Sequence, residues 1–416
     1  MNTESFERYE SNVRSYCRSF PAVFKNAKGA LIFDEDGKRY IDFFCGASAL
    51  NYGHNNDYIK SKIIEYLNSD GIIHSLDMYT SAKRDFIDTF ESKILAPRGL
   101  DYKIQFPAPT GTNAIEAALK LSRKAKKRSN IFALMGAFHG MTLGSIALTT
   151  DSVSRLGASI PLTNVTHIPS PYMYPEFDTI EYMENLITDD HSGVERPAAI
   201  FIETVQAEGG IYVLSDEYLR RLRELCDKYD ILLVVDDIQV GCGRTGAFFS
   251  FERAGIVPDM VALSKSIGGF GLPFSLLLFK PELDLWTPAE HNGTFRGNNL
   301  SFVGAKAAIE IFCSQNIQNE VLRKGALTAN YISEKILPLN SNIEMRGIGM
   351  LIGLDFSKID ASLAKKISQK AFELGLIVEL AGRDNAVLKL MPPLVISDSE
   401  LFEGLEILRQ AVTLCL

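Results

Sequence analysis

The chain has 416 residues, of which 46% are hydrophobic and 23% charged, and its formal net charge at pH 7 is −8. This length exceeds one ordinary hydrophobic core, and the composition is typical of a globular protein rather than of a disordered or fibrous one. The negative charge, without a lysine- and arginine-rich stripe, argues against a nucleic-acid partner.

The cysteines and the N-terminal residues argue against metal-binding, disulfide-stabilised, secreted and membrane-spanning classes of protein. There is no C-x-x-C pair and no histidine at zinc-ligand spacing, so we expect neither a metal site nor a disulfide framework. The first residues lack the basic and apolar regions of a signal peptide, and no apolar run approaches the ~18 residues that span a bilayer. We therefore expect a cytoplasmic protein that binds no membrane. The six cysteines are Cys17, Cys45, Cys226, Cys242, Cys313 and Cys415.

Short apolar runs alternate with helical patterns from about residue 104 onward. An alanine-rich helix is expected over residues 114–127, and a second helix over residues 215–228, where Ser215 can cap the first turn. Such alternation predicts an α/β fold with a mostly parallel sheet covered by helices. The runs that we predict as buried strands are residues 131–135, 198–205, 231–235, 260–263 and 274–279.

The pattern changes after residue 300. We expect helices over residues 305–312 and 361–374, a strand over residues 350–355, and a closing helix from Ser399. These elements predict a second, smaller α+β domain, which the N-terminal segment joins. The expected division is residues 1–50 for the N-terminal part of the small domain, 51–300 for the large domain and 301–416 for the C-terminal small domain.

Two predicted strands end in side chains that can carry chemistry. Residues 231–235 run into Asp236, and residues 260–263 are followed by Ser264 and Lys265. Catalytic groups of α/β sheets lie at such carboxyl ends, although a lone carboxylate there can also cap the next turn. A buried lysine has a lowered pKa and a free amine that can form an imine. This pair suits pyridoxal phosphate (PLP), because the lysine binds its aldehyde and the carboxylate keeps its ring nitrogen protonated.

Two further segments could hold such a cofactor. Gly111 and Thr112 precede the alanine-rich helix, where backbone amides and a hydroxyl favour a phosphate, and the alternative is a plain helix cap. Phe138 follows the strand at residues 131–135 and could stack on a ring, or it could simply pack in the core.

These blocks, with residues 203–210, 241–246, 293–298 and 346–349, resemble the class III aminotransferases of fold type I, in the same order over nearly the whole chain. The resemblance implies a large PLP-binding domain with a mostly parallel seven-stranded sheet and a smaller α+β domain built from the N- and C-terminal segments. It also implies PLP as the cofactor and a homodimer or higher oligomer whose active sites are shared between subunits.

The same resemblance implies roles for individual residues. It makes Lys265 the Schiff-base lysine and proton shuttle, Asp236 the partner of the pyridine nitrogen, and Gln239 the neighbour of the phenolic oxygen. The other implied cofactor contacts are Gly111 and Thr112 at the phosphate, Phe138 on the ring, His139 and Glu203 as its support, and Thr294 as a phosphate ligand from the second subunit.

Two positions depart from the ornithine- and γ-aminobutyrate-type members of this family. Met141 stands where they have an arginine that binds a far carboxylate, and Lys389 replaces the arginine that binds the α-carboxylate opposite a glutamate gate. Lysine offers a point charge instead of a planar fork. Both departures, with residues 14–21 and 293–299, resemble the diaminobutyrate–2-oxoglutarate aminotransferases of ectoine biosynthesis.

That subgroup implies transfer of the amino group of L-glutamate to L-aspartate 4-semialdehyde, by a ping-pong mechanism, giving L-2,4-diaminobutyrate and 2-oxoglutarate. We hypothesise that the two missing carboxylate-binding arginines are replaced by Arg18, Arg296 and Lys389, and that Glu208 is the gate opposite Lys389. The alternative for Arg18 and Arg296 is a structural ion pair.

Other functions on the same scaffold stay open at this point. One is a transaminase for another ω-amino acid or diamine, and another is a semialdehyde aminomutase. A non-enzymatic alternative is a sensor that binds PLP without turnover. Sensors of that kind usually carry a DNA-binding domain, for which we find no room before residue 20.

Overall fold

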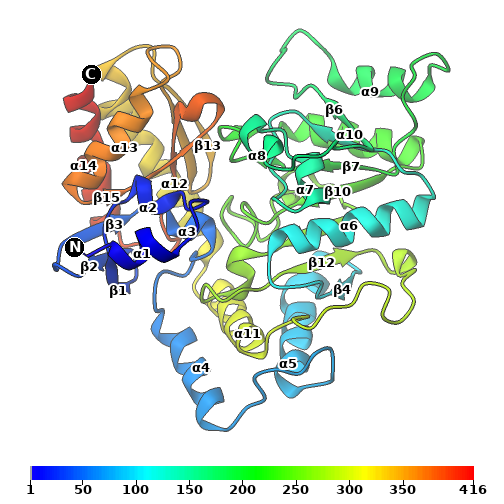
Figure 1. The fold of residues 1–416 in the computed structure, drawn as a ribbon, viewed down its shortest axis with the longest axis horizontal. Coiled ribbons are helices and arrows are strands. Elements are labelled where there is room, and N and C mark those ends of the chain that lie inside the picture. The colour runs from blue at the N-terminus through cyan, green and yellow to red at the C-terminus, as the bar shows by residue number, and fades with distance from the viewer. Residues whose placement is uncertain (1) are drawn as a thin grey trace.

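The computed structural model describes residues 2–416, so only residue 1 of the expected N-terminal segment lies outside it. Figure 1 shows two bodies side by side: one contains the middle of the chain, and the other contains both chain ends. The region between residues 103 and 283 supplies the strands of the first body, whereas segments before residue 50 and after residue 340 supply the strands of the second.

The first body is built on a seven-stranded sheet with the strand order β4-β12-β11-β10-β7-β5-β6. Every neighbouring pair is parallel except the two pairs that β12 makes, with β11 and with β4. The predicted α/β class with a mostly parallel seven-stranded sheet is therefore confirmed. The strands are β4 (Lys103–Gln105), β5 (Ile131–Leu134), β6 (Val165–Ile168), β7 (Ala199–Ile202), β10 (Leu232–Asp236), β11 (Met260–Leu263) and β12 (Leu276–Phe279).

The strand predicted over residues 198–205 is two strands in the structure. β7 ends at Ile202, and β8 (Val205–Gln206) pairs with β9 (Tyr212–Val213) in a separate two-stranded sheet. Glu203 lies at the break between the two strands, and its side chain is buried. Strands β4 and β6 were not predicted, because both are short edge strands with mixed polar and apolar residues.

Helix starts are set by local caps. α6 (Gly111–Lys126) begins three residues earlier than predicted, because the side chain of Asn113 accepts a hydrogen bond from the Thr110 amide (3.2 Å). α10 (Asp216–Lys228) is capped as expected by Ser215, whose hydroxyl accepts from the Tyr218 amide (3.1 Å). The other helices of this region are α4 (Asp57–Asn68), α5 (Ser81–Phe90), α7 (Leu143–Leu148), α8 (Ser152–Leu156) and α9 (Thr179–Thr188).

Both ends of the chain meet in the second body. β3 (Arg39–Asp42) pairs in parallel with β15 (Leu376–Ile377), and β1 (Phe24–Lys28) and β2 (Leu31–Asp34) complete that sheet. A second, antiparallel sheet has the order β13-β14-β17-β16 and places Glu379 directly opposite Lys389. Its strands are β13 (Glu344–Ile348), β14 (Leu351–Asp355), β16 (Glu379–Ala381) and β17 (Val387–Leu390).

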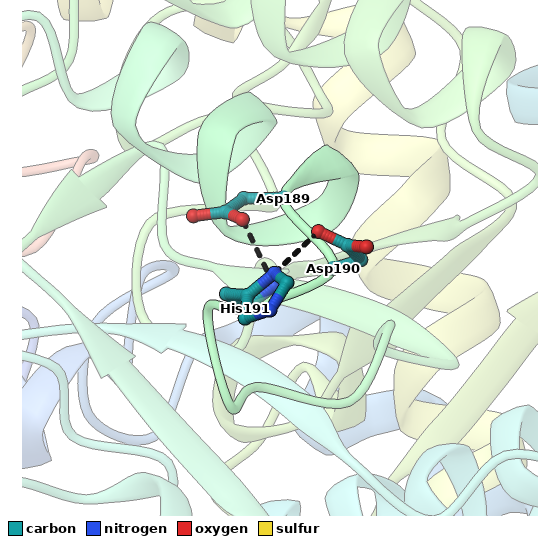
Figure 2. Close-up of side chains that lie close together, drawn as sticks. All are labelled: Asp189, Asp190 and His191. Carbon is teal, nitrogen blue, oxygen red and sulfur yellow. Dashed lines mark hydrogen bonds and ion pairs between the residues drawn. The ribbon is translucent and has the colours of Figure 1, made fainter.

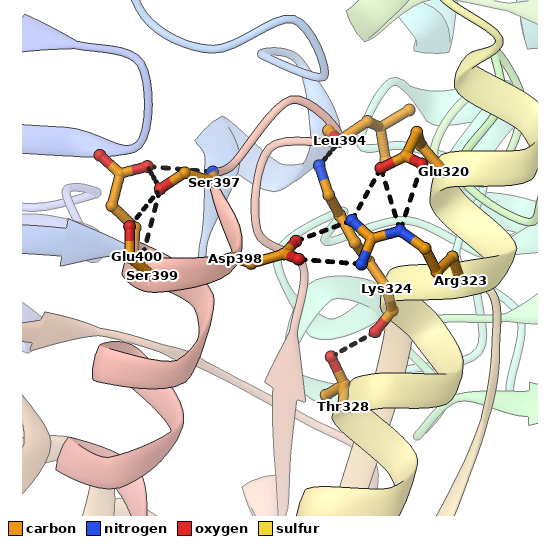
Figure 3. Close-up of polar contacts among 9 residues, drawn as sticks. All are labelled: Glu320, Arg323, Lys324, Thr328, Leu394, Ser397, Asp398, Ser399 and Glu400. Atoms are coloured by element: carbon orange, nitrogen blue, oxygen red, sulfur yellow. Dashed lines mark hydrogen bonds and ion pairs between the residues drawn. The ribbon is translucent and has the colours of Figure 1, made fainter.

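Three short and three long helices complete the second body, and Figure 3 shows polar contacts between two of the long ones, α12 and α14. Arg323 of α12 binds Asp398, the first residue of α14, at 2.7 Å, and Ser397 with Glu400 forms a capping box there. The closing helix therefore begins one residue before the predicted Ser399. The helices are α1 (Glu4–Tyr9), α2 (Tyr16–Ser19), α3 (Cys45–Ser48), α12 (Ile317–Lys335), α13 (Leu363–Leu374) and α14 (Asp398–Cys415). α11 (Asn299–Ser314) packs instead against α4 and α5 (Figure 1).

Short 3-10 or π turns connect these elements. The turns are η1 (Glu91–Leu95), η2 (Ala96–Arg98), η3 (Glu252–Ala254), η4 (Lys265–Gly268), η5 (Pro281–Leu283), η6 (Leu337–Leu339) and η7 (Arg383–Asn385). None of the helices within residues 2–416 has both the length and the apolar character needed to cross a membrane.

Candidate active site

A pocket lies at the carboxyl ends of the parallel strands, where α/β folds bind their ligands. Nine of the residues singled out from the sequence line it: Gly111, Thr112, Phe138, His139, Glu203, Glu208, Asp236, Gln239 and Lys265. Gly140, Ile238 and Val240 complete the lining. The structure thus brings together segments that are up to 154 residues apart, from Gly111 to Lys265.

Lys265 directly follows β11 and Ser264, and it begins the turn η4 with a left-handed φ of 52°. A non-glycine residue in this conformation is uncommon and is found most often at functional sites. Ser264 fixes the turn, because its hydroxyl donates to the carbonyl of Phe274 (2.7 Å). Burial lowers the pKa of Lys265, and the positive charge of Lys389 adds to this effect, although Glu208 opposes it. The amine is therefore more readily available in its neutral form.

Asp236 ends β10 and is held from two sides. Its Oδ2 lies 2.7 Å from Nδ1 of His139, and its Oδ1 accepts a hydrogen bond from the amide of Ile238 (3.1 Å). Burial acts to lower the pKa of His139, but the hydrogen bond and charge of Asp236 outweigh it, so the pKa is raised. The histidine therefore favours its charged form and holds the carboxylate toward the pocket.

The two neighbouring acids behave differently. Glu203 accepts a hydrogen bond from the amide of Phe138 (3.0 Å), and burial raises its pKa to about 8. Asp237 does not line the pocket; its Oδ2 accepts from the amide of Ser250 (3.0 Å), and burial raises its pKa to about 7. Of the two consecutive aspartates, only Asp236 faces the pocket.

The start of α6 forms a cradle beside Thr112. The first amides of a helix have no partner within the helix and favour an anion. The Thr112 hydroxyl lies 2.7 Å from that of Thr142 and 2.8 Å from that of Ser145, two residues that were missed from the sequence. A Cβ atom on Gly140 would come within 2.5 Å of Thr112 Oγ1, so a glycine is needed there.

Gln239 connects the pocket to a buried ion-pair cluster. Its Nε2 donates to Oε1 of Glu208 (3.0 Å), and the same oxygen lies 2.5 Å from Nζ of Lys389. Lys389 does not line the pocket and has no exposed side-chain surface. The expected contact between Glu208 and Lys389 is present, and its role as a gate stays a prediction.

A second carboxylate on Lys389 was missed from the sequence. Glu379 Oε2 lies 2.9 Å from Lys389 Nζ. The hairpin of β16 and β17 pairs Glu379 with Lys389. The hydropathy pattern did not reveal this hairpin, so the contact could not be predicted from the sequence.

Besides Lys389, three residues expected at the site lie outside this pocket in the single chain. Arg18 is exposed on α2. Arg296 lies 3.6 Å from Asp77, in agreement with the alternative of a structural ion pair. Thr294 is exposed, and its carbonyl lies 3.1 Å from a ring nitrogen of His74.

One group of residues in the described part of the chain has the spacing of metal ligands: Asp189, Asp190 and His191 (Figure 2). They are consecutive and exposed, in the turn after α9. Asp189 accepts from the backbone amide of His191 (2.9 Å), and His191 Nδ1 lies 2.7 Å from Asp190. These contacts are those of a local turn, so we assign no metal to them.

Comparison with known proteins decides the family. The family model of class-III aminotransferases matches residues 14–412. The chain belongs to the class-III aminotransferases. This aminotransferase is 52% identical over 416 residues to a diaminobutyrate–2-oxoglutarate transaminase from Nocardia farcinica, covering 99% of the chain and 95% of that relative. It is 49% identical over 409 residues to the protein of that name from Halalkalibacterium halodurans, covering 98% and 95%.

Solved structures agree on the fold. An ornithine aminotransferase from Toxoplasma gondii, with partial occupancy of PLP at its active site, matches with a TM-score of 0.86 and 25% identity, over 98% of this aminotransferase and 92% of that chain. An aminotransferase from Bacillus anthracis matches in fold with a TM-score of 0.88 and 23% identity, over 99% and 97%. This aminotransferase is PLP-dependent.

The pocket itself fits PLP. A lysine amine and a buried carboxylate are both present, as an aldehyde and a ring nitrogen require. Oε1 of Gln239 is buried and has no hydrogen-bond partner within residues 2–416, so it can accept one from a ligand. A Cβ atom on Gly111 would lie 2.8 Å from the Ile238 side chain, so glycine keeps the start of α6 close to the pocket wall.

Proposed function

We propose that this aminotransferase moves the amino group of L-glutamate to L-aspartate 4-semialdehyde, giving L-2,4-diaminobutyrate and 2-oxoglutarate, and runs the reverse reaction. The relatives named for that activity support the substrates, since about half of the residues are identical over nearly the whole chain. The observation that carries the proposal is the ion pair of Glu208 and Lys389 beside Lys265.

This ion pair suits two different substrates. Glutamate carries a carboxylate on the carbon that reacts, whereas the reacting carbon of diaminobutyrate has a hydrogen in its place. Lys389 can bind the carboxylate of glutamate when Glu208 moves aside, and Glu208 neutralises Lys389 when the substrate brings no such carboxylate. One pocket can therefore serve both halves of a ping-pong reaction.

The roles of the cofactor-binding residues follow from their chemistry. Bound PLP supplies an aldehyde that binds amines and a protonated ring that withdraws electrons. Asp236, oriented by His139, would hold a proton on the ring nitrogen, and Oε1 of Gln239 would accept a hydrogen bond from the phenolic hydroxyl. The neutral amine of Lys265 would take the proton from the reacting carbon and return it in the reverse step.

The remaining pocket residues would bind and orient. The α6 amide of Gly111 and the hydroxyl of Thr112 would hold the phosphate. Phe138 would lie on the ring, and its backbone is fixed by the hydrogen bond to Glu203.

We further propose that the enzyme is a homodimer or a higher oligomer with shared sites. Thr294 would complete the phosphate site of the partner subunit, which accounts for its exposed position in one chain. Arg296 and Arg18 would contribute carboxylate-binding charge only in such an assembly, since neither lines the pocket of its own chain.

The domain division at residues 50 and 300 is part of the same proposal. The pairing of β3 with β15 supports it, because residues 39–42 lie against residues 376–377. We also place the enzyme in the cytoplasm; its six cysteines are free, as a reducing compartment requires.

A donor screen tests the proposed reaction. The purified holoenzyme is mixed with glutamate, diaminobutyrate, ornithine or γ-aminobutyrate, and the absorbance of the bound cofactor is followed. We expect rapid conversion by glutamate and diaminobutyrate and slow conversion by the other two. Conversion by ornithine as fast as by diaminobutyrate would contradict the substrate assignment, and net turnover of a semialdehyde without an added amino donor or acceptor would indicate a mutase.

A further inference from the structure

The buried cluster around Lys389 holds more negative than positive charge. Lys389 Nζ lies 2.5 Å from Glu208 and 2.9 Å from Glu379, and its side chain has no exposed surface. Burial raises the pKa of Glu379, and the positive charge of Lys389 acts against this rise. With both glutamates ionised, two carboxylates face one ammonium. In the proposed mechanism Lys265 acts as a neutral amine, which is uncharged and does not balance the excess.

The two carboxylates differ in their access to the pocket. Glu208 lines the pocket and its side chain is 30% exposed, whereas Glu379 is 9% exposed and lies outside the lining. Oε1 of Glu208 accepts hydrogen bonds from Nζ of Lys389 and Nε2 of Gln239, and no hydrogen bond within residues 2–416 reaches Oε2. Glu208 therefore has one fixed oxygen and one oxygen available to a ligand.

Lys389 alone would cancel the charge of Glu208. A carboxylate in a closed ion pair attracts a second cation only weakly, because the two charges of the pair oppose each other at the position of the ligand. Glu379 changes this balance, since it also binds Lys389, from the neighbouring strand, so that the three charges together leave one net negative charge beside the pocket. Tyr16 of α2, whose pKa is raised by burial and by Glu379 and Glu208, stays neutral beside them.

We propose that Glu208 Oε2 binds the α-ammonium group of 2,4-diaminobutyrate and that Glu379 is a positioning residue that makes this possible by sharing Lys389. This inference rests on the proposed function. Diaminobutyrate carries its α-ammonium on a carbon two positions from the carbon that reacts, so a carboxylate beside Lys265 is within reach of it. Glutamate has no second ammonium and brings a carboxylate to Lys389 instead, so it makes no use of the excess negative charge.

The test is Glu379→Gln, which keeps the shape of the side chain and removes its charge. The dissociation constants of diaminobutyrate and glutamate are measured in separate half-reactions of the holoenzyme by stopped-flow absorbance. We expect the constant for diaminobutyrate to rise about tenfold with little change in its limiting rate, and the constant for glutamate to change by less than about threefold. Glu379→Asp, which keeps the charge, should retain the preference for diaminobutyrate.

Asp355→Asn is the matched control. Asp355 lies in the same antiparallel sheet and pairs with Arg346 at 2.8 Å, but it does not line the pocket. It should leave the ratio of the two constants unchanged, which separates a charge effect from a loosened sheet. Equal weakening of both donors by Glu379→Gln, or no effect on diaminobutyrate, would overturn the role of Glu379.

A ligand pair tests the inference without a variant. 4-Aminobutyrate differs from 2,4-diaminobutyrate only in lacking the α-ammonium, and the wild-type enzyme should bind it at least about tenfold more weakly. Equal affinity would overturn the role of Glu208 Oε2, even if the Gln variant does not fold. Wild-type enzyme that does not react with diaminobutyrate would instead contradict the proposed function itself.

Discussion

Nδ1 of His139 lies 2.7 Å from Oδ2 of Asp236, and both side chains are buried at the end of β10. Asp236→Asn keeps a side chain of the same shape but cannot hold a proton on a ring nitrogen. We expect turnover to fall by about 10²-fold or more, since a preorganised charge at the reacting group is lost. The measurement is kcat with saturating glutamate and the amino acceptor, with circular dichroism as a check on folding.

The adjacent residue supplies the control for this change. Asp237→Asn alters a carboxylate of the same strand end that faces away from the pocket and accepts from the Ser250 amide. Its turnover should stay within about threefold of the wild-type value, as expected for a residue without contact to the reacting atoms. Similar losses in both variants would assign the effect to the strand rather than to Asp236.

Lys265 should be indispensable. Lys265→Ala removes the amine proposed to bind the cofactor and to move the substrate proton, so turnover should fall by about 10⁴-fold or more. The absorbance of cofactor covalently bound to the lysine should also vanish. Lys280→Ala, which removes a lysine that pairs with Asp259 at 2.7 Å outside the pocket, serves as the control. Full activity of the Lys265 variant would refute the assignment.

A shared site predicts complementation between two defective enzymes. Lys265→Ala lacks the amine, and Thr294→Ala lacks the hydroxyl proposed to reach the partner's phosphate site. Random reassociation of the two should restore about one quarter of wild-type activity, because half of the dimers are hybrids and each hybrid has one intact site. The measurement is activity after mixing under dissociating and then native conditions. Mixtures no more active than their components would rule out sharing through Thr294.

The buried carboxyl of Asp237 should make stability depend on pH. Burial raises its pKa from 3.8 to about 7 in the folded chain. Between these two values the folded state binds more protons than the unfolded state, so this carboxyl favours unfolding increasingly as pH rises to about 7, and the effect then levels off. Asp237→Asn has no such penalty. Urea unfolding at pH 5 and pH 8 should show the variant gaining stability relative to wild type at the higher pH. The same difference in the free energy of unfolding between variant and wild type at both pH values would contradict this.

Arg244 is a fully buried cation that binds neutral groups. Its guanidinium donates to Asn51 Oδ1 and Pro392 O (both 2.5 Å), to Met350 O (3.0 Å) and to Ser48 Oγ (3.1 Å). Lysine cannot reach all of these acceptors from one point, so Arg244→Lys should reduce the free energy of unfolding by about 3 kcal/mol. Denaturant unfolding measures the change, and a loss below about 1 kcal/mol would show that the acceptors find other donors.

Local patterns were enough to predict much of the large domain. The runs before Asp236 and Lys265 are continuous and apolar because buried parallel strands are covered on both faces, and this signal is readable without knowing any contact. The start of α10 was equally readable, since Ser215 acts on an amide three residues away. The edge strand β4, with only three residues, gave no comparable signal.

The sequence by itself therefore determined the order of strands and helices, the strand-end positions of Asp236 and Lys265, and the family to which they point. Tertiary structure alone decided which side chains meet. The register of β16 and β17 placed Glu379 on Lys389, and the fold brought His139 to Asp236 from 97 residues away. Such contacts depend on strand register and on packing between distant segments, and neither is encoded in the local periodicity of the chain.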